Sequence, residues 1–230
     1  PRKGEDTYKW NWNTPLFISP HAHTRLYGAA NKIFRSNDRG NSWEVITEDL
    51  TRQIDRNTFQ AMGKYWSIDA VVKDVSTSLW GLTVSLAESK VKKDLLFAGT
   101  DDGVIAITED GGKNWTRITT FPGVPEYTYV SDILADKFNE NIVYAAFNNH
   151  QKDDFKPYLL KSTDKGKSWS SIASNLPVNH TVLTIAQDFK EPEMLFVGTE
   201  FGVFVTLDGG NIWNQLSGNI PTVKVPDIVI

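Results

Sequence analysis

The sequence predicts an all-β fold that is built from four copies of one antiparallel unit. The first observation is a turn pattern, Ser/Thr-x-Asp-x-Gly-x-x-Trp, which occurs four times in the 230 residues. The second is that short apolar runs of strand length lie on both sides of each copy. A repeat of roughly 40 to 50 residues made of short strands is typical of a propeller blade. We therefore expect a partial β-propeller: four four-stranded blades and the first strand of a fifth.

Each position of the turn pattern suits a tight connection between two antiparallel strands. The Asp carboxylate can accept bonds from nearby backbone N–H groups, and the Gly can take the positive φ that such a turn needs. The hydroxyl residue ends the incoming strand, and the Trp begins the next one as a large apolar anchor. We expect these residues to be structural: Ser36, Asp38, Gly40, Trp43, Thr108, Asp110, Gly112, Trp115, Ser162, Asp164, Gly166, Trp169, Thr206, Asp208, Gly210 and Trp213.

The blades follow in chain order after a polar start. The second unit shows the repeated order of strands well, because LTVSLAES is followed by DLLFAGT, GVIAITE and NWTRIT. The last eight residues, VKVPDIVI, align with the first run of the third and fourth units, so they are expected to begin another blade. The predicted blades span residues 8–47, 80–120, 129–174 and 181–217, and the strand of the next blade spans residues 223–230.

The spacing of the turn pattern locates an insertion. The four Trp residues of the pattern are 72, 54 and 44 residues apart. The last interval is the length of a bare blade, so the first carries extra residues, which we place at 48–79. Insertions of this length in a compact domain are usually functional or disordered.

Composition excludes several classes of function. A net charge of -4 argues against a nucleic-acid partner, and no apolar run approaches the roughly 18 residues of a membrane span. With no cysteine there is no disulfide or thiolate metal site, and we expect neither a metal nor a cofactor. An arc of four blades would leave two apolar end faces uncovered. We therefore expect the remaining blades of a larger parent protein, or a second copy, to cover them.

The repeated turns resemble the Asp-box, or BNR repeat, of sialidase-like and sortilin-like β-propellers. Segments such as WNTPLFISPH and FVGTEFGVFVTLDGGNIW are similar to large bacterial BNR-repeat proteins labelled glycosyl hydrolases. The resemblance implies a location outside the cell or in a bacterial envelope. Sialidase activity is not expected, because no Arg-Ile-Pro segment precedes the first box. The xyloglucanase-like relatives use acidic residues between two propellers, a cleft that one partial propeller would not form alone.

Candidate site residues lie on the face opposite the boxes, where second and third strands are joined and one blade leads to the next. Asp101 in GTDDG and Glu200 in GTEFG are the candidate catalytic carboxylates. The alternative interpretation makes both of them turn residues, because the two segments occupy equivalent positions of the repeat. Candidate ligand-binding residues are Tyr65, Trp66, Asp102, Tyr127 and Phe201.

Three functions remain open. The first is a non-catalytic scaffold or binding module for a carbohydrate or protein ligand. The second is part of a glycoside hydrolase whose active site needs further blades, and the third is a platform for protein–protein interaction. A glycosidase needs two carboxyl groups about 5 to 10 Å apart in a cleft, whereas a binding module needs only a concave aromatic and polar surface.

Overall fold

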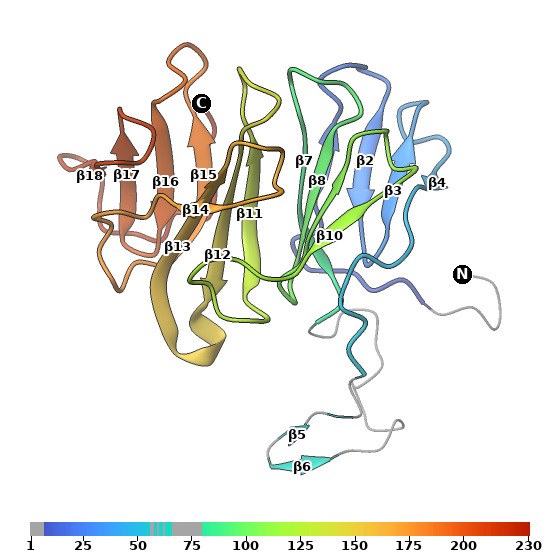
Figure 1. The fold of residues 1–230 in the computed structure, drawn as a ribbon, viewed down its shortest axis with the longest axis horizontal. Helices are drawn as coiled ribbons and strands as arrows, with labels where there is room; N and C mark the ends of the chain where they lie inside the picture. Colours follow the sequence, from blue (N-terminus) through green and yellow to red (C-terminus); the bar gives the residue numbers. More distant parts are fainter. Residues whose placement is uncertain (1–6, 56–57, 59, 62, 66–79) are drawn as a thin grey trace.

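The computed structural model describes residues 7–55, 58, 60–61, 63–65 and 80–230. The fold is all-β: four antiparallel four-stranded sheets stand side by side in chain order (Figure 1). In each sheet, consecutive strands pair as a meander. This arrangement confirms the predicted partial propeller, and we call the sheets blades 1 to 4. No helix among the described residues is long or apolar enough to span a membrane.

The strands are short, as in other propeller blades. Blade 1 contains β1 (Leu16–Ile18), β2 (Leu26–Ala29), β3 (Ile33–Ser36) and β4 (Glu44–Val45); blade 2 contains β7 (Thr83–Glu88), β8 (Leu96–Thr100), β9 (Ile105–Thr108) and β10 (Thr116–Ile118). Blade 3 contains β11 (Tyr129–Ala135), β12 (Val143–Asn149), β13 (Asp154–Ser162) and β14 (Ser170–Ser171), with a short 3₁₀ turn, η2 (His150–Lys152), between β12 and β13; blade 4 contains β15 (Val182–Gln187), β16 (Leu195–Thr199), β17 (Gly202–Thr206) and β18 (Asn214–Gln215).

The hydrophobic core lies between the blades. Three separate clusters of buried side chains join blade 1 to blade 2, blade 2 to blade 3 and blade 3 to blade 4. Both faces of a blade are apolar as a result, so β8, β9 and β15 are buried along their full length. A blade is therefore stabilised mainly by its neighbours, as expected for a repeat array.

The four predicted boxes are the turns between the third and fourth strands, and they share one hydrogen-bond pattern. In blade 3, the Ser162 hydroxyl accepts the N–H of Gly166 at 2.7 Å and donates to Asp164 at 2.7 Å. The same carboxylate accepts the N–H of Ser168 at 2.8 Å and its hydroxyl at 2.6 Å. These donors, with those of the equivalent turns, lower the pKa of Asp38, Asp110 and Asp164 to about 2.

The burial of the box tryptophans depends on the blade that precedes them. Trp169 and Trp213 are 8% and 3% exposed, because each packs against the preceding blade. Trp43 in blade 1 is 45% exposed. On the same blade, Leu16 and Ile18 of β1 are also exposed. We call the surface formed by Leu16, Ile18, Trp43 and Val45 the open face.

The predicted first strand of a fifth blade is not a strand in the structure. Residues 223–230 nevertheless run along blade 4: the N–H of Val225 donates to the carbonyl of Thr199 at 2.9 Å, and Val225 lies against Gly198. Val130 of β11 lies against Gly99 in the same way two blades earlier. The tail thus occupies the place of an inner strand, but no described residue pairs with it as a second strand of a hydrogen-bonded ladder.

The insertion is described only in part. It contains a two-stranded hairpin, β5 (Gln60–Ala61) and β6 (Lys64–Tyr65), which lies away from the four blades in Figure 1. The rest of the predicted insert between residues 66 and 79 lies outside the described residues.

Candidate functional site

The turns between second and third strands, together with the loops that lead from one blade to the next, form what we call the turn face. Asp101 and Asp102 lie there in the turn between β8 and β9. Asp101 is buried, and its carboxylate accepts three backbone N–H bonds: from Trp80 at 2.7 Å and from Gly81 and Leu82 at 2.8 Å. These bonds fasten the loop that enters blade 2 to the turn that joins its second and third strands.

Burial dominates the electrostatics of this pair. The pKa of Asp101 is raised to about 6, because desolvation and the neighbouring Asp102 raise it by more than the three backbone donors lower it. Desolvation also raises the pKa of Asp102. The Asp102 carboxylate accepts the hydroxyl of Thr100 at 2.5 Å and the N–H of Arg52 at 2.7 Å. Both aspartates therefore face protein donors rather than open solvent.

An aromatic and cationic group lies beside these turns. The rings of Trp80 and Tyr127 stack with centroids 5.8 Å apart and planes at 14°. The guanidinium of Arg52 lies 4.6 Å from the Tyr127 ring centroid, and the ammonium of Lys152 lies 5.5 Å from it. Tyr127 keeps 36% of its surface exposed, so the group is accessible from outside.

Trp80 and Tyr127 are also unusual in their backbone. Their φ angles are +64° and +59°. A left-handed conformation is an outlier for a bulky side chain, and such strain concentrates at functional sites. The two residues precede equivalent first-strand positions, Thr83 and Val130, by three residues each. Sequence reasoning selected Tyr127 alone, although this shared spacing also identifies Trp80.

The structure does not bring the two candidate catalytic carboxylates together. Asp101 lies in blade 2 and Glu200 in the β16–β17 turn of blade 4, so the whole of blade 3 separates them. Phe201, beside Glu200, contacts the ring of His180 with centroids 5.0 Å apart and forms a second aromatic group. Tyr65 lies on β6 and is exposed, and Trp66 lies outside the described residues.

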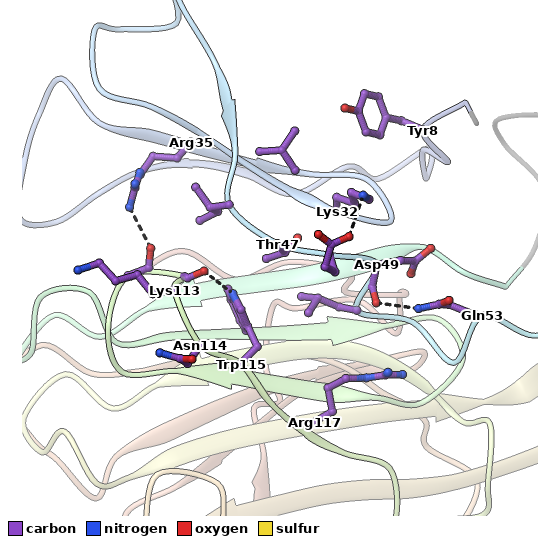
Figure 2. A pocket seen from close by; sticks show the side chains of 16 residues that line it. Tyr8, Lys32, Arg35, Thr47, Asp49, Gln53, Lys113, Asn114, Trp115 and Arg117 are labelled. Carbon is purple, nitrogen blue, oxygen red and sulfur yellow. Dashed lines mark hydrogen bonds and ion pairs between the residues drawn. The ribbon is translucent and has the colours of Figure 1, made fainter. Parts of the chain in front are cut away.

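A groove of about 870 Å³ opens between the outer strands of blades 1 and 2 (Figure 2). Lys113, Trp115 and Arg117 of blade 2 form one wall, and residues 46–50 after blade 1 form the other. Across one end, the Arg35 guanidinium donates to the carbonyl of Gly111 at 2.9 Å. The half-buried indole of Trp115 donates to the carbonyl of Gly112 at 3.2 Å. Sequence reasoning did not identify this groove.

Comparison with known proteins finds partial sequence similarity to xyloglucanases. No protein-family profile matches the chain. The xyloglucanase Xgh74A of Acetivibrio thermocellus is 25% identical over 149 residues, which cover 59% of this chain. The chain spans 18% of the length of that enzyme.

Solved structures show the fold. An ancestral GH74 enzyme superposes with a TM-score of 0.64 at 16% identity, over 94% of this chain and 25% of that structure. The β-propeller domain of Cps50 (Swd1) from Myceliophteria thermophila superposes with a TM-score of 0.55 at 12% identity, over 92% of this chain and 57% of that domain. These likenesses support the partial propeller; they do not establish the chain as an Asp-box family member.

Proposed function

We propose that this chain is one part of a larger propeller glycoside hydrolase related to the xyloglucanases, and that it binds glycan without supplying the acid–base pair. The observation that carries the proposal is the similarity to Xgh74A over 149 residues. The chain covers only a small share of that enzyme, so a complete active site would draw on further blades.

The positions of the carboxylates support a role in binding glycan without a catalytic pair in this chain. A glycosidase pair needs one group that releases a proton to the leaving oxygen and another that attacks or activates water, both within reach of one sugar ring. Asp101 accepts three backbone bonds, and Glu200 lies two blades away. In our proposal both are turn residues, and the catalytic carboxylates come from outside this chain.

The open face of blade 1 supports a larger propeller independently. Trp169 and Trp213 are covered by the blade before them, whereas Trp43 leaves 45% of its surface to solvent. Exposed apolar patches on a soluble protein mark contact surfaces. We propose that another blade of the parent protein covers the open face. A second copy of the chain is the alternative partner.

The turn face supplies the features that glycan binding needs. Stacked aromatic rings offer apolar faces to the C–H surface of a sugar, and the flanking cations offer hydrogen-bond donors to hydroxyl groups. Tyr127 with Trp80, and Phe201 in blade 4, are the proposed contacts. Because xyloglucan is an extracellular polysaccharide, we propose that the protein acts outside the cell or in the envelope.

Titration with xyloglucan oligosaccharides tests the proposal. We expect binding by calorimetry, and we expect Tyr127→Ala to weaken it about five- to tenfold, because a stacked ring contributes about 1 to 1.4 kcal/mol. Phe189→Ala is the matched control, since Phe189 is an exposed aromatic at the opposite end of blade 4, in the β15–β16 turn.

Two results would overturn the proposal. One is the absence of binding to xyloglucan and to other β-glucans. The other is release of reducing ends by this chain alone with loss of that release in Asp101→Asn, because the acid–base pair would then lie within the chain.

A further inference from the structure

We infer that the groove between blades 1 and 2 binds an acidic oligosaccharide. The site is distinct from the turn-face contacts proposed above: none of Trp80, Tyr127 and Phe201 lines the groove. The two sites can therefore be tested, and can fail, separately.

The groove exists because the residue six positions after the box tryptophan differs from one blade junction to the next. Asn175 joins blade 3 to blade 4: its side-chain oxygen accepts the N–H of Trp213 at 2.7 Å, and its NH₂ group donates to the Trp213 carbonyl at 2.9 Å. Asn175 lies six residues after the box tryptophan Trp169. Phe121 occupies the same position at the preceding junction, between blades 2 and 3, where its ring packs edge-on against Trp169 with ring centroids 5.9 Å apart.

At the junction of blades 1 and 2 this position is Asp49. A carboxylate only accepts hydrogen bonds, so it cannot donate to the carbonyl of Trp115 as an Asn does. Asp49 instead accepts the NH₂ group of Asn31 at 2.9 Å and the hydroxyl of Thr51 at 2.6 Å. The outer strands of blades 1 and 2 are thus neither hydrogen-bonded through this position nor plugged by a ring, and the groove stays open.

The charge of the groove walls selects the ligand. Among the described residues, four cationic and two acidic side chains line the groove: Lys32, Arg35, Lys113, Arg117, Glu48 and Asp49. Lys32 pairs with Glu48 at 3.3 Å, and Arg35 pairs with Glu44 at 2.8 Å. Within the described part of the chain, Lys113 and Arg117 have no carboxylate partner, although the whole protein carries a net charge of -4. The Arg117 guanidinium donates one hydrogen bond to the carbonyl of Thr51, which leaves its other N–H donors for a ligand.

The two unpaired cations flank an aromatic ring. Trp115 and Arg117 are alternate residues at the start of β10, so they lie on one side of this outer strand, and Lys113 in the preceding box turn lines the same groove. Figure 2 shows all three on the same wall of the groove. No other blade has this row: the flanking residues are Asn41 and Val45 in blade 1, Lys167 and Ser171 in blade 3, and Asn211 and Gln215 in blade 4.

This row suits a sugar chain that carries carboxylate groups. An indole offers its edge and face to pyranose rings, and a guanidinium pairs with a carboxylate through two hydrogen bonds. The amide of Gln53 adds a donor on the opposite wall. An acidic peptide would need pockets for side chains, but Leu50, one of the aliphatic residues that line the groove, is 3% exposed and already packed.

The test measures binding of oligogalacturonate to the whole chain at two salt concentrations, with xyloglucan oligosaccharide and polyglutamate as comparison ligands. Lys113→Gln and the double variant Lys113→Gln/Arg117→Gln remove the unpaired charges. Lys167→Gln is the matched control, because Lys167 is the exposed lysine at the same box position in blade 3. Asp49→Phe places a ring where Phe121 has one and closes the groove.

We expect oligogalacturonate binding that weakens about fivefold in Lys113→Gln, more in the double variant, and not in Lys167→Gln. Asp49→Phe should abolish binding because its ring fills the groove. Since this change also removes a negative charge, simple charge attraction would predict tighter binding of an acidic ligand, so the variant distinguishes the two explanations. Tyr127→Ala should leave this binding unchanged. The inference is overturned by the absence of oligogalacturonate binding, by equal losses in Lys113→Gln and Lys167→Gln, or by polyglutamate binding as tightly at the same residues.

Discussion

Replacing the box tryptophans one at a time tests whether contacts between blades hold this fold together. Trp213 and Trp43 occupy the same position of the same turn, so their local conformational preferences are matched. They differ in surroundings: Trp213 is 3% exposed in the cluster between blades 3 and 4, whereas Trp43 is 45% exposed on the open face. The pair therefore isolates the contribution of a covering blade.

The expected losses follow from the buried area. A buried aromatic side chain removes about 200 Å² from water, so at about 25 cal/mol per Å² a Trp→Ala change costs about 5 kcal/mol at Trp213 and about 3 kcal/mol at Trp43. Residual burial in the unfolded chain reduces these to about 4 and about 2 kcal/mol. The Trp213 indole N–H also donates to the Ile172 carbonyl at 2.8 Å, a bond that contributes about 1 kcal/mol.

Urea unfolding followed by far-ultraviolet circular dichroism measures both variants, because this signal does not depend on the tryptophan that is removed. We expect Trp213→Ala to lower the free energy of unfolding by at least twice as much as Trp43→Ala, at an unchanged m value. Equal losses in the two variants would refute the reasoning, because the box tryptophan would then stabilise its own turn and not the junction between blades.

Three further predictions address the junction, the buried carboxylates and the tail. Asn175→Asp removes the donor to the Trp213 carbonyl and should lower the free energy of unfolding by about 1 to 3 kcal/mol; a neutral effect in urea unfolding would contradict the role given to this position. Asp101 has a pKa of about 6 in the folded chain, above its unfolded value of 3.8. Its contribution to the free energy of unfolding is therefore complete below about pH 4 and is lost as the pH rises through 6, by up to roughly 3 kcal/mol. The box aspartates have the opposite sign, since their pKa values are lowered to about 2, and their stabilisation is lost only as the pH falls from about 4 through 2. The free energy of unfolding, measured at a series of pH values, should thus rise between pH 2 and 4 and fall between pH 4 and 6. Asp101→Asn should flatten only the fall between pH 4 and 6. Gly198→Ala places a methyl group against the Val225 carbonyl and should speed hydrogen exchange at residues 224–228. Gly209→Ala strains its own turn, because Gly209 has a φ of +70°, but its methyl group meets only the Lys161 ammonium, so it should not speed exchange at residues 224–228.

The fold could be predicted from the sequence because its signal repeats. Four boxes fix four turns, and the apolar runs around each box fix four strands per blade. The tail shows the limit of this reasoning. Residues 223–230 have the pattern of an inner strand and follow blade 4 as one, but a strand requires a bonded partner strand as well as a suitable pattern.

The candidate site was harder to predict because burial does not show in a repeat alignment. Asp101 and Glu200 occupy similar turns, yet Asp101 fastens the loop into blade 2 with three bonds, while Glu200 is half-buried in blade 4. The partners of Tyr127 come from three segments, at Arg52, Trp80 and Lys152. Only the folded chain brings these segments together.

The residues that break the repeat are the better guide to function in this protein. The box residues recur because every blade needs the same turn. The position six residues after each box tryptophan does not recur: it is Asp49, Phe121 and Asn175 at the three junctions. Phe121 joins neighbouring blades by ring packing and Asn175 joins them by hydrogen bonds. The Asp49 side chain makes neither kind of contact with the next blade and accepts hydrogen bonds on its own side of the junction instead. The open junction is also the one that carries the unpaired Lys113 and Arg117, so the same departure from the repeat creates the space and exposes the charges that a ligand would use.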